Sequence, residues 1–132
     1  MTDINFTEDS GRTPRSVAPA QTCDTHSHIY GPLKHYPRIV DSRRLATINA
    51  YRGMLQRLGI ERCVLVHSSM YGTDNSITLD AIKMLGQKIA RGTAVISHET
   101  KVDEIRRLDT GGIRGVRVSS SNDDITLSQV SD

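Results

Sequence analysis

Short apolar runs alternate with longer segments of helical periodicity along most of this chain, and this alternation limits its fold more than any other feature. Four runs have the composition of strands: residues 22–28, 62–69, 93–97 and 113–119. Segments with apolar residues three or four positions apart lie between them, at 45–59, 74–89 and 102–112. Strands that alternate with helices in this way are typical of a parallel sheet with right-handed βαβ connections. The order β, α, β, α, β, α, β therefore predicts an α/β fold.

Each predicted helix has one apolar face and a recognisable boundary. The first face holds Leu45, Ile48, Leu55 and Leu58, and Gly59 is the expected stop. The second holds Ile77, Ala81, Leu85 and Ile89 at i, i+4 spacing, after Asp74 as the expected N-cap. The third holds Val102, Ile105 and Leu108, with Gly111 and Gly112 at its end. Such faces are expected to pack on the sheet.

Two architectures fit four such strands. One is a small open α/β sheet, and the other is half of an eight-stranded (β/α) barrel. No glycine-rich phosphate loop of the G-x-G-x-x-G or Walker type follows the first strand, which disfavours nucleotide-binding versions of the open sheet. The pattern alone leaves both architectures open.

The length of 132 residues is typical of one domain. Residues 1–20 lack periodic hydrophobicity and contain Pro14 and Pro19, so we expect a flexible N-terminal arm there. Residues 21–120 are the predicted domain, and residues 121–132 are a predicted polar tail.

Composition excludes several classes of function. A net charge of +2 with only 4% aromatic residues disfavours nucleic-acid binding, which needs a basic stripe and stacking aromatics. No stretch approaches the roughly 20 apolar residues of a membrane span, and the polar first residues do not resemble a signal peptide. We expect a cytoplasmic protein in which Cys23 and Cys63 are small buried thiols.

Polar side chains follow three of the predicted strands at the end where each strand stops. Strand alternation predicts that residues two apart share a face. The predicted sets are Asp24, His26 and His28 in the first strand; Cys63, Leu65, His67 and Ser69 in the second; and Ile113, Gly115 and Arg117 in the fourth. Ligands bind at the carboxyl ends of parallel strands in such folds. We therefore expect His26, His28, His67, Ser69 and Arg117 to converge on one site.

Each of these residues also has a purely structural explanation. Asp24 can fix the tautomer of a histidine, and His67 can be a buried histidine whose ring nitrogens are both hydrogen-bonded. Arg117 can pair with Asp123 or Asp124. The common position at strand ends favours the functional interpretation. His35 and His98 lack such support and are expected on the surface or in loops, and packing is the expected role of Tyr30, Tyr36 and Tyr71.

Several segments resemble the amidohydrolase superfamily. They are CDTHSHIYGP (23–32), YP (36–37), RLGIERCVLVHSSMYGTDNSITLDAI (57–82), GTAVI (92–96) and GGIRGVRV (111–118). The branch they resemble most holds 2-pyrone-4,6-dicarboxylate lactonase and sugar-lactone enzymes such as galactarolactone isomerase. The family fold is a distorted (β/α)8 barrel, so the resemblance implies that this chain is the N-terminal half of a TIM-type barrel.

The resemblance also implies roles. His26 and His28 would bind and polarise the ester carbonyl of a carboxylated lactone, Ser69 and His67 would lie in the substrate site, and Arg117 would bind a substrate carboxylate. The resemblance to this branch also implies a reaction that needs no metal. In that reaction water attacks the ester carbonyl and an aspartate takes the proton of the water. We therefore expect no cofactor. The alternative, common elsewhere in the superfamily, is a divalent metal such as zinc on His26 and His28.

The sequence departs from this branch at several positions. Arg44 stands where the dicarboxylate lactonase has a tyrosine, and His67 stands where it has a glutamine. The loop SSSNDD (119–124) lacks a second arginine. The later histidine, arginine and general-base aspartate of the family lie on strands that this chain does not reach. A pyrone dicarboxylate is therefore not the expected substrate, and the chain alone is expected to be inactive.

Two other functions remain open at this point. A half-barrel leaves two strand edges and one sheet face uncovered, so the chain can be a non-enzymatic binding or assembly module that forms a homo-oligomer. It can also be a metal-dependent hydrolase that another chain completes.

Overall fold

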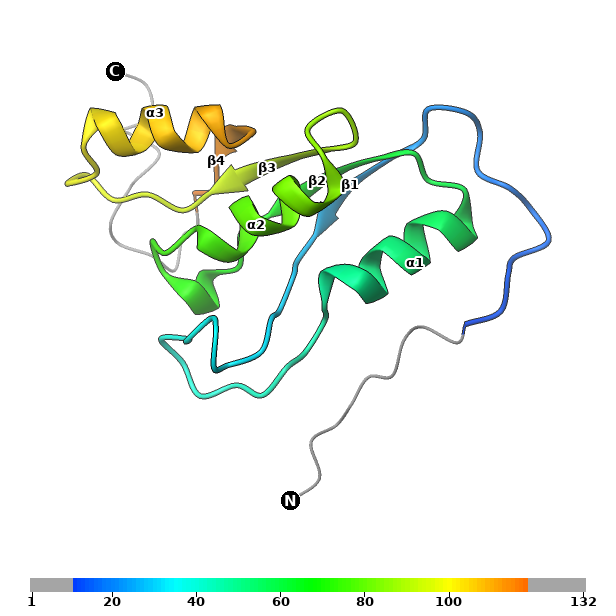
Figure 1. Ribbon diagram of the computed structural model, residues 1–132, viewed down its shortest axis with the longest axis horizontal. Coiled ribbons are helices and arrows are strands. Elements are labelled where there is room, and N and C mark those ends of the chain that lie inside the picture. Colours follow the sequence, from blue (N-terminus) through cyan, green and yellow to red (C-terminus); the bar gives the residue numbers. More distant parts are fainter. Residues whose placement is uncertain (1–10, 119–132) are drawn as a thin grey trace.

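The computed structural model describes residues 11–118, which form one layer of helices on one parallel sheet (Figure 1). The strands are β1 (Cys23–Ser27), β2 (Arg62–Val66), β3 (Ala90–Ala94) and β4 (Ile113–Val116). They pair in the order β1-β2-β3-β4, and all three pairings are parallel. The connections are α1 (Ile48–Leu58), the short 3-10 helix η1 (Ser69–Tyr71) with α2 (Ser76–Leu85), and α3 (Val102–Thr110). The predicted α/β fold is confirmed.

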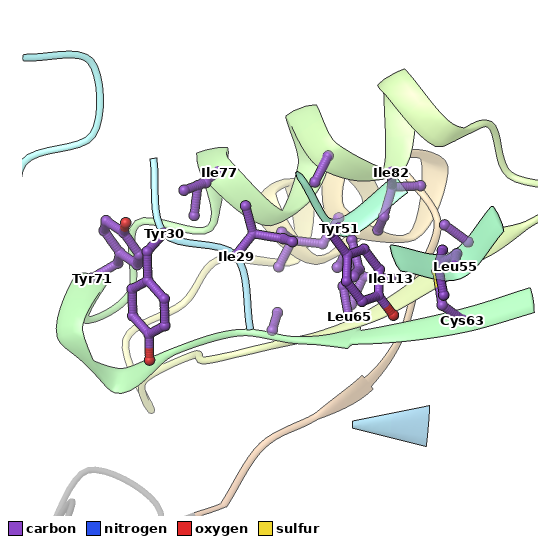
Figure 2. Packing of buried hydrophobic residues seen from close by; sticks show 14 residues of the cluster. Ile29, Tyr30, Tyr51, Leu55, Cys63, Leu65, Tyr71, Ile77, Ile82 and Ile113 are labelled. Carbon is purple, nitrogen blue, oxygen red and sulfur yellow. The ribbon is translucent and has the colours of Figure 1, made fainter. Parts of the chain in front are cut away.

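The three helices cover the same face of the sheet. Their buried residues join one core cluster with buried residues of the strands (Figure 2). Leu65 and Ile82 are 1% and 0% exposed and lie near its centre. The opposite face, hereafter the open face, carries the alternate residues Val64, Val66, Arg91 and Thr93, which are only half-buried. No helix within residues 11–118 covers the open face.

α2 lies directly against β3 because Gly92 has no side chain. A Cβ atom at Gly92 would be 2.9 Å from Ile82 Cδ1 and 3.0 Å from both Thr78 Cγ2 and Ile113 Cδ1. Ala90 and Ala94, on the same side of β3, are small and fully buried. β3 is therefore a strand of small residues under a helix.

This packing corrects two of the sequence predictions. The third strand is Ala90–Ala94 and not 93–97, because its buried residues are small and lie before the apolar run. α2 ends at Leu85, where Gly86 has a φ of 87°. Ile89, which was expected on the helix, therefore lies in the following turn and is 43% exposed.

The ends of α1 follow the sequence signals closely. The Thr47 hydroxyl accepts a hydrogen bond from Ala50 N at 3.2 Å, as an N-cap residue does. Gly59, the predicted stop, has a φ of 70° and its N–H bonds Gln56 O. Leu45 precedes the helix, which begins at Ile48.

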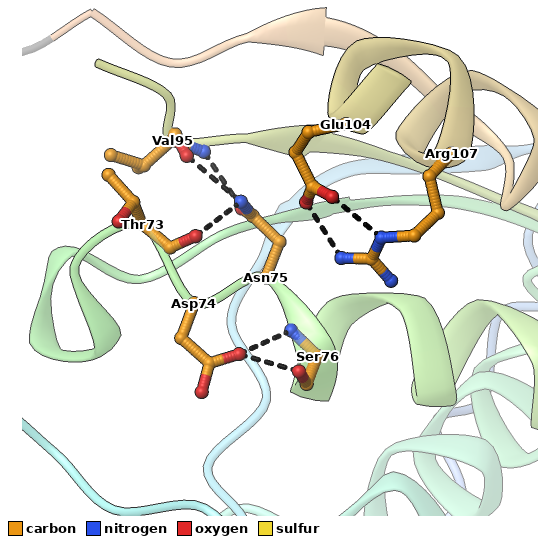
Figure 3. Close-up of polar contacts among 7 residues, drawn as sticks. All are labelled: Thr73, Asp74, Asn75, Ser76, Val95, Glu104 and Arg107. Carbon is orange, nitrogen blue, oxygen red and sulfur yellow. Dashed lines mark hydrogen bonds and ion pairs between the residues drawn. The ribbon is translucent and has the colours of Figure 1, made fainter. Parts of the chain in front are cut away.

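The start of α2 differs from the prediction by one residue. Asn75, not Asp74, is the N-cap, while Asp74 Oδ1 accepts from Ser76 N at 3.1 Å and from Ser76 Oγ at 2.5 Å (Figure 3). These hydrogen bonds lower the pKa of Asp74. The buried Asn75 side chain instead bonds both Val95 N and Val95 O at 2.9 Å. It thereby ties the loop after β2 to the end of β3.

The predicted face of α3 is only partly buried. Leu108 is 3% exposed, but Val102 is 61% and Ile105 is 45% exposed. On the surface of α3, Arg107 donates two hydrogen bonds of 2.7 Å to Glu104, and these lower the pKa of Glu104 (Figure 3).

The remaining predictions concern the termini and the membrane. Residues 11–20 form no helix or strand and are mostly exposed, whereas residues 1–10 of the predicted arm and the predicted tail lie outside the described residues. No helix in residues 11–118 is long and apolar enough to cross a membrane. Cys63 is buried as predicted, and Cys23 is half-buried.

Candidate functional site

An irregularity in β1 separates Asp24 from the two histidines that follow it. Asp24 pairs with Cys63, Ser27 pairs with Leu65, and the register shifts between them. The Asp24 carboxylate accepts hydrogen bonds from Tyr51 Oη of α1 at 2.6 Å, from His26 N at 3.1 Å and from the Ser27 hydroxyl. Asp24 therefore lies on the helix-covered side, and the prediction that it shares a face with His26 and His28 is wrong.

Opposing effects act on the charge of Asp24. Burial raises the pKa of this carboxyl, but the three hydrogen bonds outweigh burial and hold the pKa below its usual range. Burial also raises the pKa of Tyr51, as does its hydrogen bond to Asp24. The pair is thus an ionised carboxylate with a neutral phenol, and it holds the backbone of β1 at the irregularity.

His26 and His28 lie together beyond this irregularity. Their ring centroids are 5.1 Å apart, with the planes nearly perpendicular at 82°. His28 Nδ1 lies 2.7 Å from Val66 O, at the end of β2. A carbonyl oxygen only accepts, so Nδ1 carries a proton. Nε2 of His28 makes no hydrogen bond to residues 11–118 and is free for a ligand.

Arg117 reaches the same end of β2 from the other side. Its Nη1 donates a hydrogen bond of 2.9 Å to His67 O, the carbonyl next to the one that His28 binds. Arg117 N also bonds Ala94 O at 2.8 Å, which fixes the backbone after β4. An imidazole and a guanidinium therefore bind consecutive carbonyls of one strand end.

A second register shift, between β3 and β4, changes which residues of β4 lie on the same face as Arg117. Ile113 contacts the Gly92 position on the helix-covered side, but Gly115 pairs with Thr93, and a Cβ at Gly115 would be 3.4 Å from Thr93 Cγ2. Gly115 thus lies on the open face. The prediction that Ile113 shares a face with Gly115 and Arg117 is therefore wrong for Ile113.

His67 lies on the opposite side of the sheet from the histidine pair. It is 0% exposed, its Nδ1 lies 2.8 Å from Thr78 Oγ1 of α2, and its Nε2 lies 3.1 Å from Gly72 O. Nε2 therefore donates to the carbonyl and Nδ1 accepts from the Thr78 hydroxyl. Burial lowers the pKa of His67 to about 4. Both ring nitrogens are used inside the protein, so its side chain supports the loop 67–78.

The remaining predicted residues vary in exposure. Ser69, at the start of η1, is exposed, and its side chain makes no hydrogen bond to residues 11–118. Tyr30 and Tyr71 are buried in the core, as the packing interpretation predicts. His35 and His98 are exposed.

The sequence pattern did not identify two residues whose side chains hold the loops at this end of the sheet. One is Asn75. The other is Arg38, whose guanidinium donates to Gly31 O and to two further carbonyls of its own loop, and lies 5.6 Å and 5.7 Å from the ring centroids of Tyr30 and Tyr71. Its place in a proline-containing loop gives no periodic signal that could have identified it.

The histidine pair does not by itself form a metal site. A protonated Nδ1 on a backbone carbonyl with a free Nε2 is the usual state of a metal-bound histidine. However, catalytic zinc needs three protein ligands, and no group of three His, Cys, Asp or Glu side chains in residues 11–118 is placed to hold a metal ion. The described residues therefore do not fit a complete metal centre.

The pocket between α1 and α2 is separate from these residues. It has a volume of about 80 Å³ and is lined mainly by apolar side chains, including Ile48, Ile77 and Met84. None of the predicted site residues lines it. The site at the end of β2 is instead an open rim on the surface of residues 11–118.

Comparison with known proteins gives several relatives, although no protein-family model matches the chain. The 4-sulfomuconolactone hydrolase of Rhizobium radiobacter is 35% identical over 103 residues, which are 75% of this chain and 34% of the relative. The 2-pyrone-4,6-dicarboxylate hydrolase of Comamonas testosteroni is 33% identical over 108 residues, 79% of this chain and 35% of the relative. The D-galactarolactone isomerase of Agrobacterium fabrum is 27% identical over 83% of this chain and 38% of its own.

Solved structures agree with these relatives. A crystal structure of an Agrobacterium tumefaciens protein superposes with a TM-score of 0.76 at 26% identity, over 92% of this chain and 44% of that one. A probable 2-pyrone-4,6-dicarboxylic acid hydrolase of Acinetobacter baumannii, solved with citric acid bound, has a TM-score of 0.64 at 26% identity, over 79% of this chain and 42% of that one.

The chain spans about a third of the length of the curated relatives it matches. Its four parallel strands match part of the chain in each of the solved structures. The chain is therefore homologous to 2-pyrone-4,6-dicarboxylate hydrolase, sulfomuconolactone hydrolase and galactarolactone isomerase of the amidohydrolase-related group, over the part of those proteins that it spans.

Proposed function

We propose that this chain carries the first half of the active site of a hydrolase that opens the ester bond of a carboxylated lactone. The observation that carries the proposal is the meeting of His28 and Arg117 on consecutive carbonyls at the end of β2, with His26 beside them. Two of the curated relatives are named as hydrolases of lactones or pyrone esters that bear acidic groups. An arginine and two imidazoles on one rim suit such a substrate.

The hydrogen bond between His28 Nδ1 and Val66 O limits how His28 could act in the proposed reaction. Its Nδ1 already donates to Val66 O, so it can donate to a substrate carbonyl only through a protonated Nε2. His28 therefore acts as an imidazolium, which stabilises the negative charge that develops on the carbonyl oxygen. His26, whose ring packs edge-on at 5.1 Å, is placed to help bind that oxygen.

Arg117 is the proposed anchor for the substrate carboxylate. Its Nη1 is bound to His67 O at 2.9 Å, which holds the guanidinium plane, and its other donors make no hydrogen bonds within residues 11–118. A guanidinium held in this way binds a carboxylate through two parallel hydrogen bonds. Ser69, exposed at the same strand end, is the proposed polar neighbour of the substrate.

The general base must come from outside this set of residues. In the proposed reaction a water attacks the lactone carbonyl, the ring C–O bond breaks, and the products are a carboxylate and a hydroxyl group. The nearest acid on β1, Asp24, faces α1 and accepts from Tyr51, Ser27 and His26 N, so it does not face the open rim. The base would lie in a segment that completes the barrel.

A chimera tests the proposal. Residues 11–118 would replace the matching segment of the Comamonas 2-pyrone-4,6-dicarboxylate hydrolase, which supplies the rest of its own chain. We expect hydrolysis of carboxylated lactones that falls 100-fold or more in the His28→Ala and Arg117→Ala chimeras. A folded chimera that is inactive on all such lactones, or is unaffected by both changes, would contradict the proposal. His35→Ala, in an exposed loop, is the matched control.

A second candidate function rests on the uncovered surfaces of the sheet. β1 and β4 are edge strands in the described structure, and the open face includes a buried Thr93 hydroxyl that has no hydrogen-bond partner in residues 11–118. These features suit a non-enzymatic assembly module in which two copies pair edge to edge as a homodimer. A light-scattering mass of the purified chain distinguishes a dimer of defined size from a monomer.

A further inference from the structure

Two consecutive peptide groups at the end of β2 connect it to the other three strands. The carbonyl of the first, Val66 O, lies 2.7 Å from Nδ1 of His28, the residue that follows β1. The N–H of the same peptide group belongs to His67 and donates a hydrogen bond of 3.2 Å to Thr93 O of β3. The next carbonyl, His67 O, accepts a hydrogen bond of 2.9 Å from Arg117, which follows β4. The backbone at Val66 and His67 therefore holds both groups that are proposed to bind the substrate.

The His67 side chain joins this backbone to α2 on the other side of the sheet. Its Nδ1 accepts a hydrogen bond of 2.8 Å from the Thr78 hydroxyl, and its Nε2 donates one of 3.1 Å to Gly72 O. His67 is 0% exposed and Thr78 is 4% exposed, so water does not compete for the bond between them. The Tyr71 ring packs against the imidazole, with 5.9 Å between the centroids. The orientation of the His67 ring is therefore fixed by contacts on several sides.

The packing of α2 on β3 fixes Thr78 in turn. A Cβ atom at Gly92 would lie 3.0 Å from Thr78 Cγ2, so the Thr78 methyl group faces β3. The methyl and hydroxyl groups of a threonine occupy two staggered positions on the same carbon, so fixing one of them fixes the other. The hydroxyl is thereby directed at His67 Nδ1. A helix packed on the sheet thus supports the open rim through two buried side chains.

We propose that His67 and Thr78 are positioning residues, which set the places of His28 and Arg117 relative to each other without contacting the substrate. The inference rests on the proposed function, because this placement matters only if the two groups share a substrate. Loss of the Thr78 hydroxyl would leave His67 Nδ1 as a buried acceptor without a donor, which is costly. The imidazole would then turn or shift, and the backbone that His28 and Arg117 bind would shift with it.

The test uses the 132-residue chain without a ligand. Long-range 15N–1H NMR spectra at pH 8 give the tautomer of His28, which Val66 O biases towards Nδ1–H in the wild type. We expect Thr78→Val, which keeps the shape of the side chain and removes its hydroxyl, to weaken this bias at least about threefold. The Arg117 guanidinium should also rotate faster by a similar factor. Thr78→Ser, which keeps the hydroxyl, should retain the wild-type values of both.

Thr93→Val is the matched control. It makes the same chemical change at a buried hydroxyl that has no hydrogen-bond partner in residues 11–118, so both measurements should stay at their wild-type values. Three results would overturn the inference: unchanged signals of His28 and Arg117 in Thr78→Val, a change confined to one of these two groups, or equal effects of Thr78→Val and Thr78→Ser. The last result would show that packing, and not the hydroxyl, is what matters at this position.

A second measurement needs no variant. A hydroxyl proton that is donated to a buried nitrogen exchanges slowly with water, so Thr78 of the wild-type chain should give a hydroxyl signal coupled to His67 Nδ1. The absence of this signal in the folded chain would overturn the inference, even if Thr78→Val does not fold. Neither measurement needs a substrate, and the chimera tests hydrolysis separately, so the two proposals can fail independently.

Discussion

The His67 side chain contributes to how the stability of this protein responds to acid. Its pKa in the folded state is about 4, compared with 6.5 for an ordinary histidine, because burial disfavours the charged form. The unfolded chain therefore takes up the proton first as pH falls. The stability linked to His67 is complete above pH 6.5 and is lost between pH 6.5 and pH 4.

The loss of stability as the pH falls below 6.5 gives a prediction for His67→Gln. A glutamine amide can replace both hydrogen bonds of His67, to Thr78 Oγ1 and Gly72 O, without a group that titrates near neutrality. Between pH 7.5 and pH 5, we expect the wild type to lose about 2 kcal/mol more of unfolding free energy than the variant. Urea unfolding at both pH values measures this difference. His98→Gln, at an exposed site, should behave like the wild type.

The tautomers of His28 and His67 are predicted to be opposite. Both assignments follow from carbonyl acceptors: Val66 O requires a proton on Nδ1 of His28, and Gly72 O requires a proton on Nε2 of His67. Long-range 15N–1H NMR spectra at pH 8 distinguish the two forms. Two Nε2–H tautomers would show that His28 does not bind the end of β2.

At the residue scale, the sequence predicted which strand ends carry His26, His28 and Arg117 better than it predicted which faces the neighbouring residues share. The spacing of His26, His28 and Arg117 placed them at strand ends, and the structure brings them to one rim. The alternation rule failed at Asp24 and Ile113, because a register shift adds one residue to each edge strand. A period-two pattern contains no signal for such a shift.

At the scale of elements, the fit of α2 on β3 depends on Gly92. In Gly92→Ala the new Cβ would lie about 3 Å from the side chains of Ile82, Thr78 and Ile113, so the helix must shift. We expect a loss of about 1–3 kcal/mol in unfolding free energy. Gly53→Ala is the matched control, because no atom lies within 4 Å of the new Cβ on α1, and it should stabilise by about 0.5–1 kcal/mol. Equal effects of the two changes would contradict this packing.

The irregularity in β1 depends on Tyr51 of α1. Tyr51→Phe removes a 2.6 Å hydrogen bond from the Asp24 carboxylate, which holds His26 N through its other oxygen. We expect a loss of about 1–3 kcal/mol and shifts of the His26 and His28 amide signals in 1H–15N spectra. Tyr36→Phe removes a comparable bond to Asp80 at an exposed position, and should cost less than 1 kcal/mol. No change at His26 in Tyr51→Phe would contradict the role of this contact.

The type and order of the elements could be predicted because helices and strands have different periods. Boundaries were less certain where side chains are small. β3 is built from Ala90, Gly92 and Ala94, which contribute no hydrophobic signal, so the apolar run after them was taken for the strand. The N-cap of α2 was missed by one residue because both Asp74 and Asn75 are common capping residues.

At the scale of the whole molecule, the proposed function needs the described residues to supply one side of a catalytic site. They place imidazole and guanidinium groups on an open rim, with no carboxylate free to act as base among the residues that meet there. We therefore expect no lactone hydrolysis by the purified 132-residue chain alone. Turnover of several lactones by that chain, lost in His26→Ala or His28→Ala, would show that a base lies within it.

Barrel membership could not be decided from periodicity, because an open sheet and a half-barrel have the same order of elements. The resemblance of particular segments, including the one that contains His26 and His28, favoured the barrel, and superposition on solved chains supports it. Arg44 and Arg38 lie in a loop without a periodic pattern. Their convergence on Tyr30 depends on tertiary contacts that only the structure shows.

The most direct measurement of the central claim is an NMR titration of the 132-residue chain with 2-pyrone-6-carboxylate, followed at the side chains of His26, His28 and Arg117. If these groups share one rim at the end of β2, all three signals should shift along a single binding curve with one dissociation constant. A shift at Arg117 without a shift at either histidine, or curves with different dissociation constants, would show that these side chains do not form one site.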